Sequence, residues 1–108
     1  MLNTYRAMWL FVLFDMPVET KKQRKNYSDF RKSLLKDGFT MMQYSVYVRN
    51  AGSWENLEAH IRRVKSGLPK EGHIVLLPIT DKQFGRMEHF YGRMQVEAPE
   101  SPQQLSMF

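Results

Sequence analysis

The chain has 108 residues, of which 43% are hydrophobic and none is cysteine, and its formal net charge is +5. The length predicts a single domain, and the missing cysteines exclude disulfides and thiolate metal sites. The longest apolar run, from Ala7 to Phe14, is far shorter than the roughly 20 residues that a membrane-spanning helix needs. We expect a soluble, cytoplasmic protein without a membrane partner, whose basic balance favours a polyanion such as nucleic acid.

The first predicted element is a strand that ends at an acid. The run from Tyr5 to Phe14 is apolar at nearly every position and rich in aromatic and β-branched side chains, which favours a central strand buried on both faces. Pro17 follows closely and supports this interpretation. Asp15 is either a turn residue before the proline or a functional carboxylate, because a strand end is well placed to bind a hard cation.

The second predicted element is a helix over residues 20–37. Thr20 and Gln23 fit a capping box at its start, and Gly38 supplies a left-handed stop at its end. The helix has one apolar stripe, which is formed by Tyr27, Phe30 and Leu34.

Basic side chains cluster on this helix, which carries seven of them and a single acid between residues 21 and 36. Four lysines lie within about 60° of one another, opposite the apolar stripe. Such a row is either a solvated face or a ridge that follows nucleic-acid phosphates without reading sequence. The candidate nucleic-acid-binding residues are Lys21, Lys25, Lys32, Lys36, Arg24 and Arg31 on this helix, with Arg62 and Arg63 on the next one.

Three further segments complete the predicted core. Residues 39–49 predict two short strands or one strongly bent strand. Ser53 can cap a second helix that ends near Gly67. Residues 73–80 predict another strand, in which Pro78 should lie near an edge, a bulge or the strand end. The apolar face of the second helix is expected to hold Trp54, Leu57, Ile61, Val64 and Leu68.

The order β-α-β-β-α-β predicts an α+β fold, namely a ferredoxin-like sandwich with an antiparallel sheet and both helices on one face. We assign residues 1–92 to this domain and residues 93–108 to a C-terminal extension. Within the domain, residues 81–92 are expected to form a helical turn that leads into a short strand. Leu105 and Phe108 of the extension could add a strand to a partner protomer.

Several short motifs make the chain resemble a known family. FVLFDMP (residues 11–17), the basic helix after it and QYSVYVR (residues 43–49) together resemble the CRISPR-associated protein two family. This family is the small subunit of the spacer-acquisition machinery. LPITDKQFGRM (residues 77–87) is similar to members from type II systems.

The resemblance implies a homodimer at the centre of a complex with the CRISPR integrase subunit, which inserts short double-stranded DNA into the CRISPR array. Some members also cleave RNA or DNA with Mg²⁺. Asp15 matches the metal-binding aspartate of the family, so the resemblance makes it a catalytic residue that acts through Mg²⁺ shared between two Asp15 side chains at the dimer axis. The fuller family pattern has a second acidic residue soon after this aspartate. This chain departs from that pattern, because Glu19 is the only acid that closely follows Asp15. Ser45 and Tyr47 match a Ser-Val-aromatic pattern that is expected to be structural.

Two functions therefore stay open, a scaffold of the integration complex and a metal-dependent nuclease. No general base is predicted, because the chain's three histidines, His60, His73 and His89, are interpreted as structural. A single-strand RNA-binding module would use Tyr44 and Tyr47, but a regular strand places these rings on opposite faces. A membrane-surface role of the first helix is not favoured, because it would need the apolar stripe that the core of the domain requires.

Overall fold

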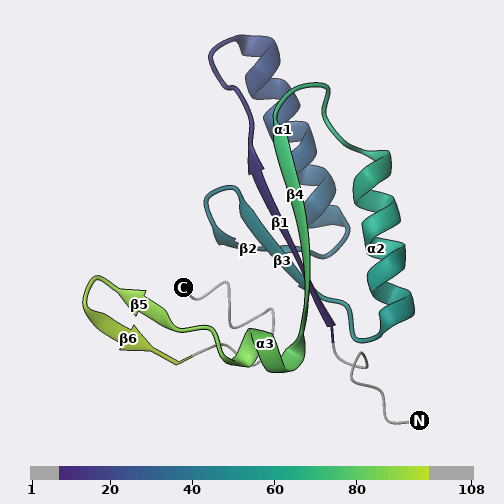
Figure 1. Cartoon of the computed structure of the whole chain (residues 1–108). Coiled ribbons are helices and arrows are strands. Elements are labelled where there is room, and N and C mark those ends of the chain that lie inside the picture. Colours follow the sequence, from purple (N-terminus) through teal and green to yellow (C-terminus); the bar gives the residue numbers. More distant parts are fainter. Residues whose placement is uncertain (1–7, 98–108) are drawn as a thin grey trace.

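The fold is built on a four-stranded antiparallel sheet with the strand order β2-β3-β1-β4 (Figure 1). The computed structural model describes residues 8–97, so the expected start of the first strand and the tail with Leu105 and Phe108 lie outside the described residues. The strands of this sheet are β1 (Met8–Asp15), β2 (Thr40–Gln43), β3 (Val46–Asn50) and β4 (His73–Thr80). The predicted ferredoxin-like α+β fold is confirmed.

Strand β1 lies between β3 and β4, which explains its apolar sequence, because a central strand is covered on both faces. It pairs with β4 along its whole length, from Met8 opposite Thr80 to Asp15 opposite His73. Strand β4 is an edge of the sheet, so the prediction for Pro78 is confirmed. The alternative of two short strands is confirmed for residues 39–49, since a two-residue turn separates β2 from β3.

Helices α1 (Lys21–Lys36) and α2 (Trp54–Ser66) cover one face of this sheet (Figure 1). Thr20 forms the predicted capping box with Gln23, and Ser53 caps α2 by accepting from the backbone N–H of Asn56. Gly38 follows α1 with a φ of 88°, as a left-handed stop requires. None of the described helices is both long and apolar enough to cross a membrane.

The main core lies between the helices and the sheet. Alternate residues of β1 point into it because successive strand side chains face opposite sides. Its centre contains Leu10, Val12, Phe14, Phe30, Leu34, Tyr47, Leu57 and Val64. The prediction that Trp54 and Leu68 belong to the buried face of the second helix is wrong. Their side chains are 42% and 47% exposed, and Leu68 lies beyond the end of α2.

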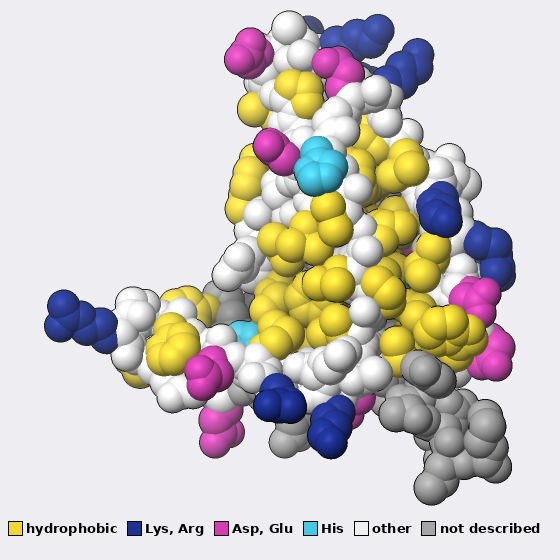
Figure 2. Space-filling model, in the orientation of Figure 1, with side chains coloured by type: hydrophobic (Ala, Val, Ile, Leu, Met, Phe, Trp, Pro, Cys, Tyr) yellow, Lys and Arg dark blue, Asp and Glu magenta, His cyan; other side chains and the backbone are white. Residues whose placement is uncertain are grey.

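The opposite face of the sheet carries a second, smaller apolar cluster. Helix α3 (Asp81–Gly85) covers one end of this face, where the ring of Phe84 stacks on Trp9 with the centroids 3.7 Å apart. Asp81 accepts a hydrogen bond of 2.9 Å from the indole N–H of Trp9. The rest of the face presents hydrophobic side chains at its centre and charged side chains at its rim (Figure 2).

Strands β5 (His89–Tyr91) and β6 (Met94–Val96) form a separate two-stranded hairpin that projects to one side (Figure 1). Helix α3 and β5 confirm the helical turn and short strand expected within residues 81–92. The hairpin crosses the boundary that the sequence places between residues 92 and 93. The division into a domain of residues 1–92 and an extension of residues 93–108 stays a prediction.

Candidate functional site

Asp15 is the last residue of β1 and lies on the face of the sheet that the two long helices leave open. Its neighbour Phe14 points into the helix-side core, so strand alternation turns the carboxylate to the other face, where it is exposed. His73 is the residue directly opposite on β4. Opposed residues of an antiparallel pair share a face, with their Cβ atoms about 5 Å apart. Both side chains line a shallow hollow of about 250 Å³.

The backbone of Asp15 is held close to Gly72. Gly72 has a φ of 109°, and a Cβ atom built on it would lie 2.9 Å from the carbonyl oxygen of Asp15 and 2.8 Å from Cγ of Met16. Glycine at this position therefore allows the start of β4 to pack against the end of β1, and it fixes where the carboxylate emerges.

Replacing Gly72 by alanine is expected to lower the free energy of unfolding by about 1–3 kcal/mol, because the new Cβ meets backbone atoms at a strained φ. Gly85→Ala is the matched control, since Gly85 has no atom within 4 Å of an added Cβ. Denaturant titration of both variants measures the difference. Equal stability of the two variants would contradict the proposed close packing at Gly72.

Tyr44 and Ser45 form another wall of the hollow, in the tight turn between β2 and β3. Ser45 has a φ of 64°. Its carbonyl oxygen accepts from the N–H of Phe14 at 3.0 Å, and its hydroxyl is 2.9 Å from the hydroxyl of Tyr27. The ring of Tyr44 is 76% exposed and stacks on Tyr27 with the centroids 5.7 Å apart. Ser45 thus has the expected structural role.

The tyrosines of this region differ in burial. Tyr47 is 1% exposed, which confirms its structural role and leaves Tyr44 as the exposed ring of the QYSVYVR segment. Burial raises the pKa of Tyr27, against the opposing effect of the hydrogen bond with Ser45. Tyr27 therefore stays an uncharged phenol near neutral pH and can support the ring of Tyr44 without adding negative charge.

One copy of the chain offers few ligands for a metal ion. Among residues 8–97, no group of three or more His, Asp or Glu side chains comes together in a way that could hold a cation. Asp15 contributes one carboxylate, and a single carboxylate is a poor Mg²⁺ site without further oxygens. A two-fold axis beside this residue would double the carboxylates and the neighbouring imidazoles, so the donor set fits a metal only across a dimer.

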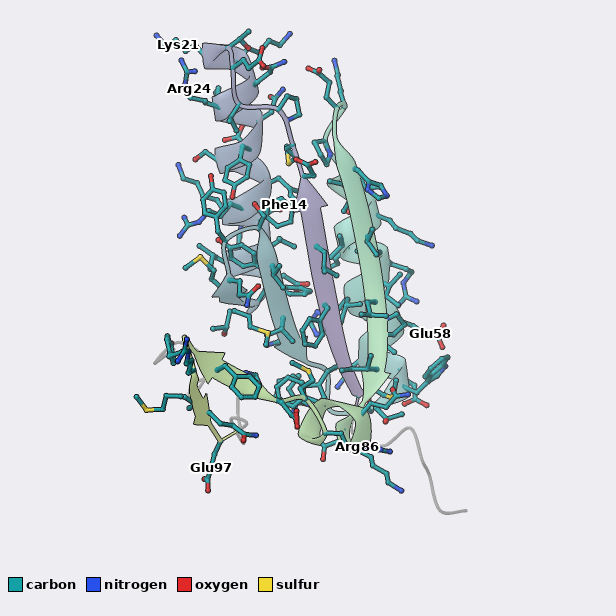
Figure 3. All side chains as sticks on the ribbon, turned by 60° about the vertical axis from the view of Figure 1, so that its left-hand side comes forward. Phe14, Lys21, Arg24, Glu58, Arg86 and Glu97 are labelled. Atoms are coloured by element: carbon teal, nitrogen blue, oxygen red, sulfur yellow. The ribbon has the colours of Figure 1, made fainter. Side chains whose placement is uncertain are left out.

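The lysine row of α1 is exposed along the helix, as the sequence predicts. Lys25 pairs with Asp29, with the ammonium nitrogen 2.8 Å from a carboxylate oxygen. Arg24 donates through Nη1 to the carbonyl oxygens of Val18 and Glu19, at 3.1 and 2.9 Å. It therefore fixes the loop that leaves β1. Figure 3 shows Arg24 near Lys21 at the start of α1.

Arg63 is held by other protein groups. Its Nε donates to Asp37 Oδ1 at 2.8 Å, and Asp37 Oδ2 lies 2.9 Å from Nδ1 of His60. The imidazole also accepts a hydrogen bond of 2.9 Å from Nε of Arg49. His60 is 5% exposed, so the structural interpretation of this histidine is confirmed. Arg62 is exposed on α2.

Replacing His60 by leucine is expected to lower the free energy of unfolding by about 1–3 kcal/mol, because the partly buried side chains of Asp37 and Arg49 lose their hydrogen bonds to the imidazole. His73→Leu, at an exposed position, should change it by less than about 0.5 kcal/mol. Thermal unfolding of both variants compares them. A larger loss of stability for His73→Leu than for His60→Leu would contradict the structural role of His60.

The sequence interpretation of His73 as a structural histidine is wrong, because the side chain is exposed beside Asp15. The signal that identifies it is the β1–β4 register, since antiparallel pairing places the first residue of one strand opposite the last of the other. His89 is half-buried in the hairpin. The roles predicted for Asp15 and for the basic residues stay predictions.

The chain is similar to proteins of one known family. The family described as CRISPR associated protein Cas2 matches residues 8–87, which extend from β1 through α3. A CRISPR-associated endoribonuclease Cas2 from Flavobacterium psychrophilum is 52% identical over 107 residues, covering 99% of this chain and 93% of that protein. Proteins with the same name from Parvibaculum lavamentivorans and Streptococcus mutans are 48% and 41% identical, over 94% and 91% of this chain and 100% and 90% of their own.

Proposed function

Because the chain belongs to the CRISPR-associated Cas2 family, we propose that it is a CRISPR adaptation protein. In this proposal a homodimer forms the core of the spacer-integration complex and binds short duplex DNA together with the integrase subunit. The observation that carries the proposal is the open apolar face of the sheet, which charged side chains of both signs surround (Figure 2).

The open face supports a homodimer. Val75 and Leu77 of β4 are 39% and 45% exposed there, beside the half-buried Leu13 of β1. A contiguous exposed apolar patch marks an interaction surface. A second copy of the chain fits this patch because the same apolar surface is complementary to itself across a two-fold axis. The axis then brings the two Asp15 side chains together.

The β5–β6 hairpin supports the same assembly. Phe90, Tyr91 and Met94 are 54%, 50% and 69% exposed on it. An isolated two-stranded hairpin is marginally stable in water, whereas addition to the edge of a partner's sheet would bury these side chains and pair the free edge. Each end of the four-stranded sheet, β2 and β4, offers such an edge.

The exposed lysines of α1, with Arg62 on α2, suit a duplex whose phosphates are contacted without sequence readout. Each phosphate contact releases counterions, so the logarithm of the binding constant should fall with the logarithm of the salt concentration by about 0.9 per contact. Lys25 and Arg63 should contribute less to this binding, because they are already paired with Asp29 and Asp37.

A second candidate function is a metal-dependent endonuclease that hydrolyses phosphodiester bonds, because the similar proteins are named endoribonucleases. The two Asp15 side chains of a dimer would hold the Mg²⁺. When bound, such a cation polarises a phosphate and lowers the pKa of water. His73, which lies opposite Asp15 on the neighbouring strand, would be the candidate proton-transfer group of this reaction.

Co-purification with the integrase subunit of the same system tests the proposal. We expect a complex that contains two copies of the chain and that inserts a short duplex into a CRISPR array in vitro. Duplex binding should weaken steeply between low and high salt. A chain that binds neither integrase nor duplex DNA, but cleaves RNA with Mg²⁺, would overturn the adaptation role in favour of the nuclease.

A further inference from the structure

We propose that Tyr44 is a stacking site for one unpaired nucleobase, next to the hollow of Asp15. The proposal rests on the proposed function only in taking the chain to bind nucleic acid. Its ligand is a single-stranded segment, either free RNA or DNA or an unpaired end of a duplex. Bases inside a duplex already stack on their neighbours, so the exposed ring distinguishes unpaired nucleotides from paired ones.

The first observation is the exposure and support of the ring. Tyr44 is 76% exposed, more than any other large hydrophobic side chain that is exposed among residues 8–97. One side of the ring is fixed by Tyr27, at an interplanar angle of 19°. A ring that is already held in place loses little conformational freedom when a base stacks on it, which favours binding.

The second observation is the strained turn that presents the ring. Ser45, the next residue, has a left-handed φ of 64°, where a non-glycine residue is strained and needs support from its surroundings. The N–H of Phe14 and the hydroxyl of Tyr27 supply this support through two hydrogen bonds to Ser45. The turn is thus anchored to both β1 and α1, which fixes the backbone from which the ring of Tyr44 projects.

The third observation is the positive charge beside the ring. Arg24 and Arg31 lie three residues before and four residues after Tyr27 on α1, so the three side chains share one side of the helix. The Arg24 guanidinium is held at the carbonyl oxygens of Val18 and Glu19, so both cationic residues lie on the helix side that carries Tyr27, which in turn supports the ring of Tyr44. Stacking rings beside positive charge are typical of single-strand binding surfaces.

The fourth observation is the position of the ring beside Asp15. Tyr44 lines the same hollow as Asp15 and His73. A base on the ring would bring its own sugar and phosphate to the end of β1. The stacking site would therefore select which phosphodiester of a strand lies next to the carboxylate.

Equilibrium binding of a single-stranded oligonucleotide with one 2-aminopurine tests the proposal. The wild-type chain should quench the emission of the stacked base. Tyr44→Leu, which keeps an apolar side chain on Tyr27, should abolish the quenching and weaken binding by about 5- to 150-fold, the range expected for one base on an aromatic ring. Tyr44→Phe should retain both. Trp54→Leu, at an exposed aromatic of α2, is the matched control and should bind as the wild type does.

Three substrates separate the sources of the unpaired base, namely single-stranded RNA, single-stranded DNA and a duplex with single-stranded ends. Quenching that depends on Tyr44 in any of them supports the proposal. A fully paired duplex should bind the wild type and Tyr44→Leu with equal affinity. Equal quenching and affinity for Tyr44→Leu and wild type would overturn it, as would an equal loss on the paired duplex. Integrase co-purification with both chains reports on the adaptation role separately, since stacking is not needed for it.

Discussion

Leu77→Asp is expected to convert the proposed homodimer into monomers and to abolish the proposed spacer integration. Leu77 lies opposite Phe11 on the open face and is 45% exposed in the single chain. In the monomer the aspartate can therefore remain hydrated, and the fold should persist. In the dimer each copy would bury an unpaired carboxylate against apolar side chains, which costs several kcal/mol. Dimerisation should weaken by at least about 100-fold, since 1.4 kcal/mol corresponds to a factor of ten.

Leu68→Asp is the matched control, because Leu68 has a similar exposure of 47% but follows α2 on the helix side of the molecule. Light scattering behind a sizing column measures the mass of each variant, and circular dichroism checks that both stay folded. Loss of the dimer in both variants would contradict the sheet face as the interface. A monomeric Leu77→Asp chain that still supports integration would remove the dimer from the mechanism.

The local structure follows closely from sequence patterns. The run from Ala7 to Phe14 has no polar residue to face solvent, so it predicts the central strand. The capping box at Thr20 and the cap at Ser53 place both long helices to within a residue, because a cap side chain satisfies specific backbone N–H groups. With these elements in order, the ferredoxin-like arrangement places Phe30 and Leu34 of α1 and Leu57 and Val64 of α2 against the sheet.

Interactions between distant segments could not be predicted in the same way. The position of His73 beside Asp15 depends on strand register, which no local pattern determines. The ion pair of Arg63 depends on the packing of α2 against the end of α1. Tyr44 has the β-propensity of a strand residue, but Ser45 adopts a left-handed turn that only its tertiary hydrogen bonds explain. His73, Tyr44 and Ser45 line the hollow of Asp15, so most of the candidate site depends on such interactions.

Asp15→Asn is expected to reduce any Mg²⁺-dependent cleavage by at least about 100-fold, because a neutral amide is a much weaker ligand for a hard cation than a carboxylate. The side chain is exposed, so the unfolding temperature and the dimer mass should stay close to those of the wild type. Glu19→Gln is the matched control, since Glu19 is an exposed acid in the loop after β1 and should not affect cleavage. Rates are measured with Mg²⁺ on single-stranded RNA and on duplex DNA.

The same variant separates the two candidate functions. If Asp15→Asn loses cleavage but integrates spacers with the integrase as the wild type does, the dimer acts as a scaffold and the carboxylate serves a separate reaction. If integration fails while the complex keeps its mass and binds duplex DNA, the carboxylates at the two-fold axis take part in adaptation itself. If cleavage persists, Asp15 is not the metal ligand. The scaffold outcome is the expected one, because the open apolar face and the exposed lysines of α1 are present on each chain. Among the described residues of one chain, by contrast, no group of three ligands could hold a metal ion.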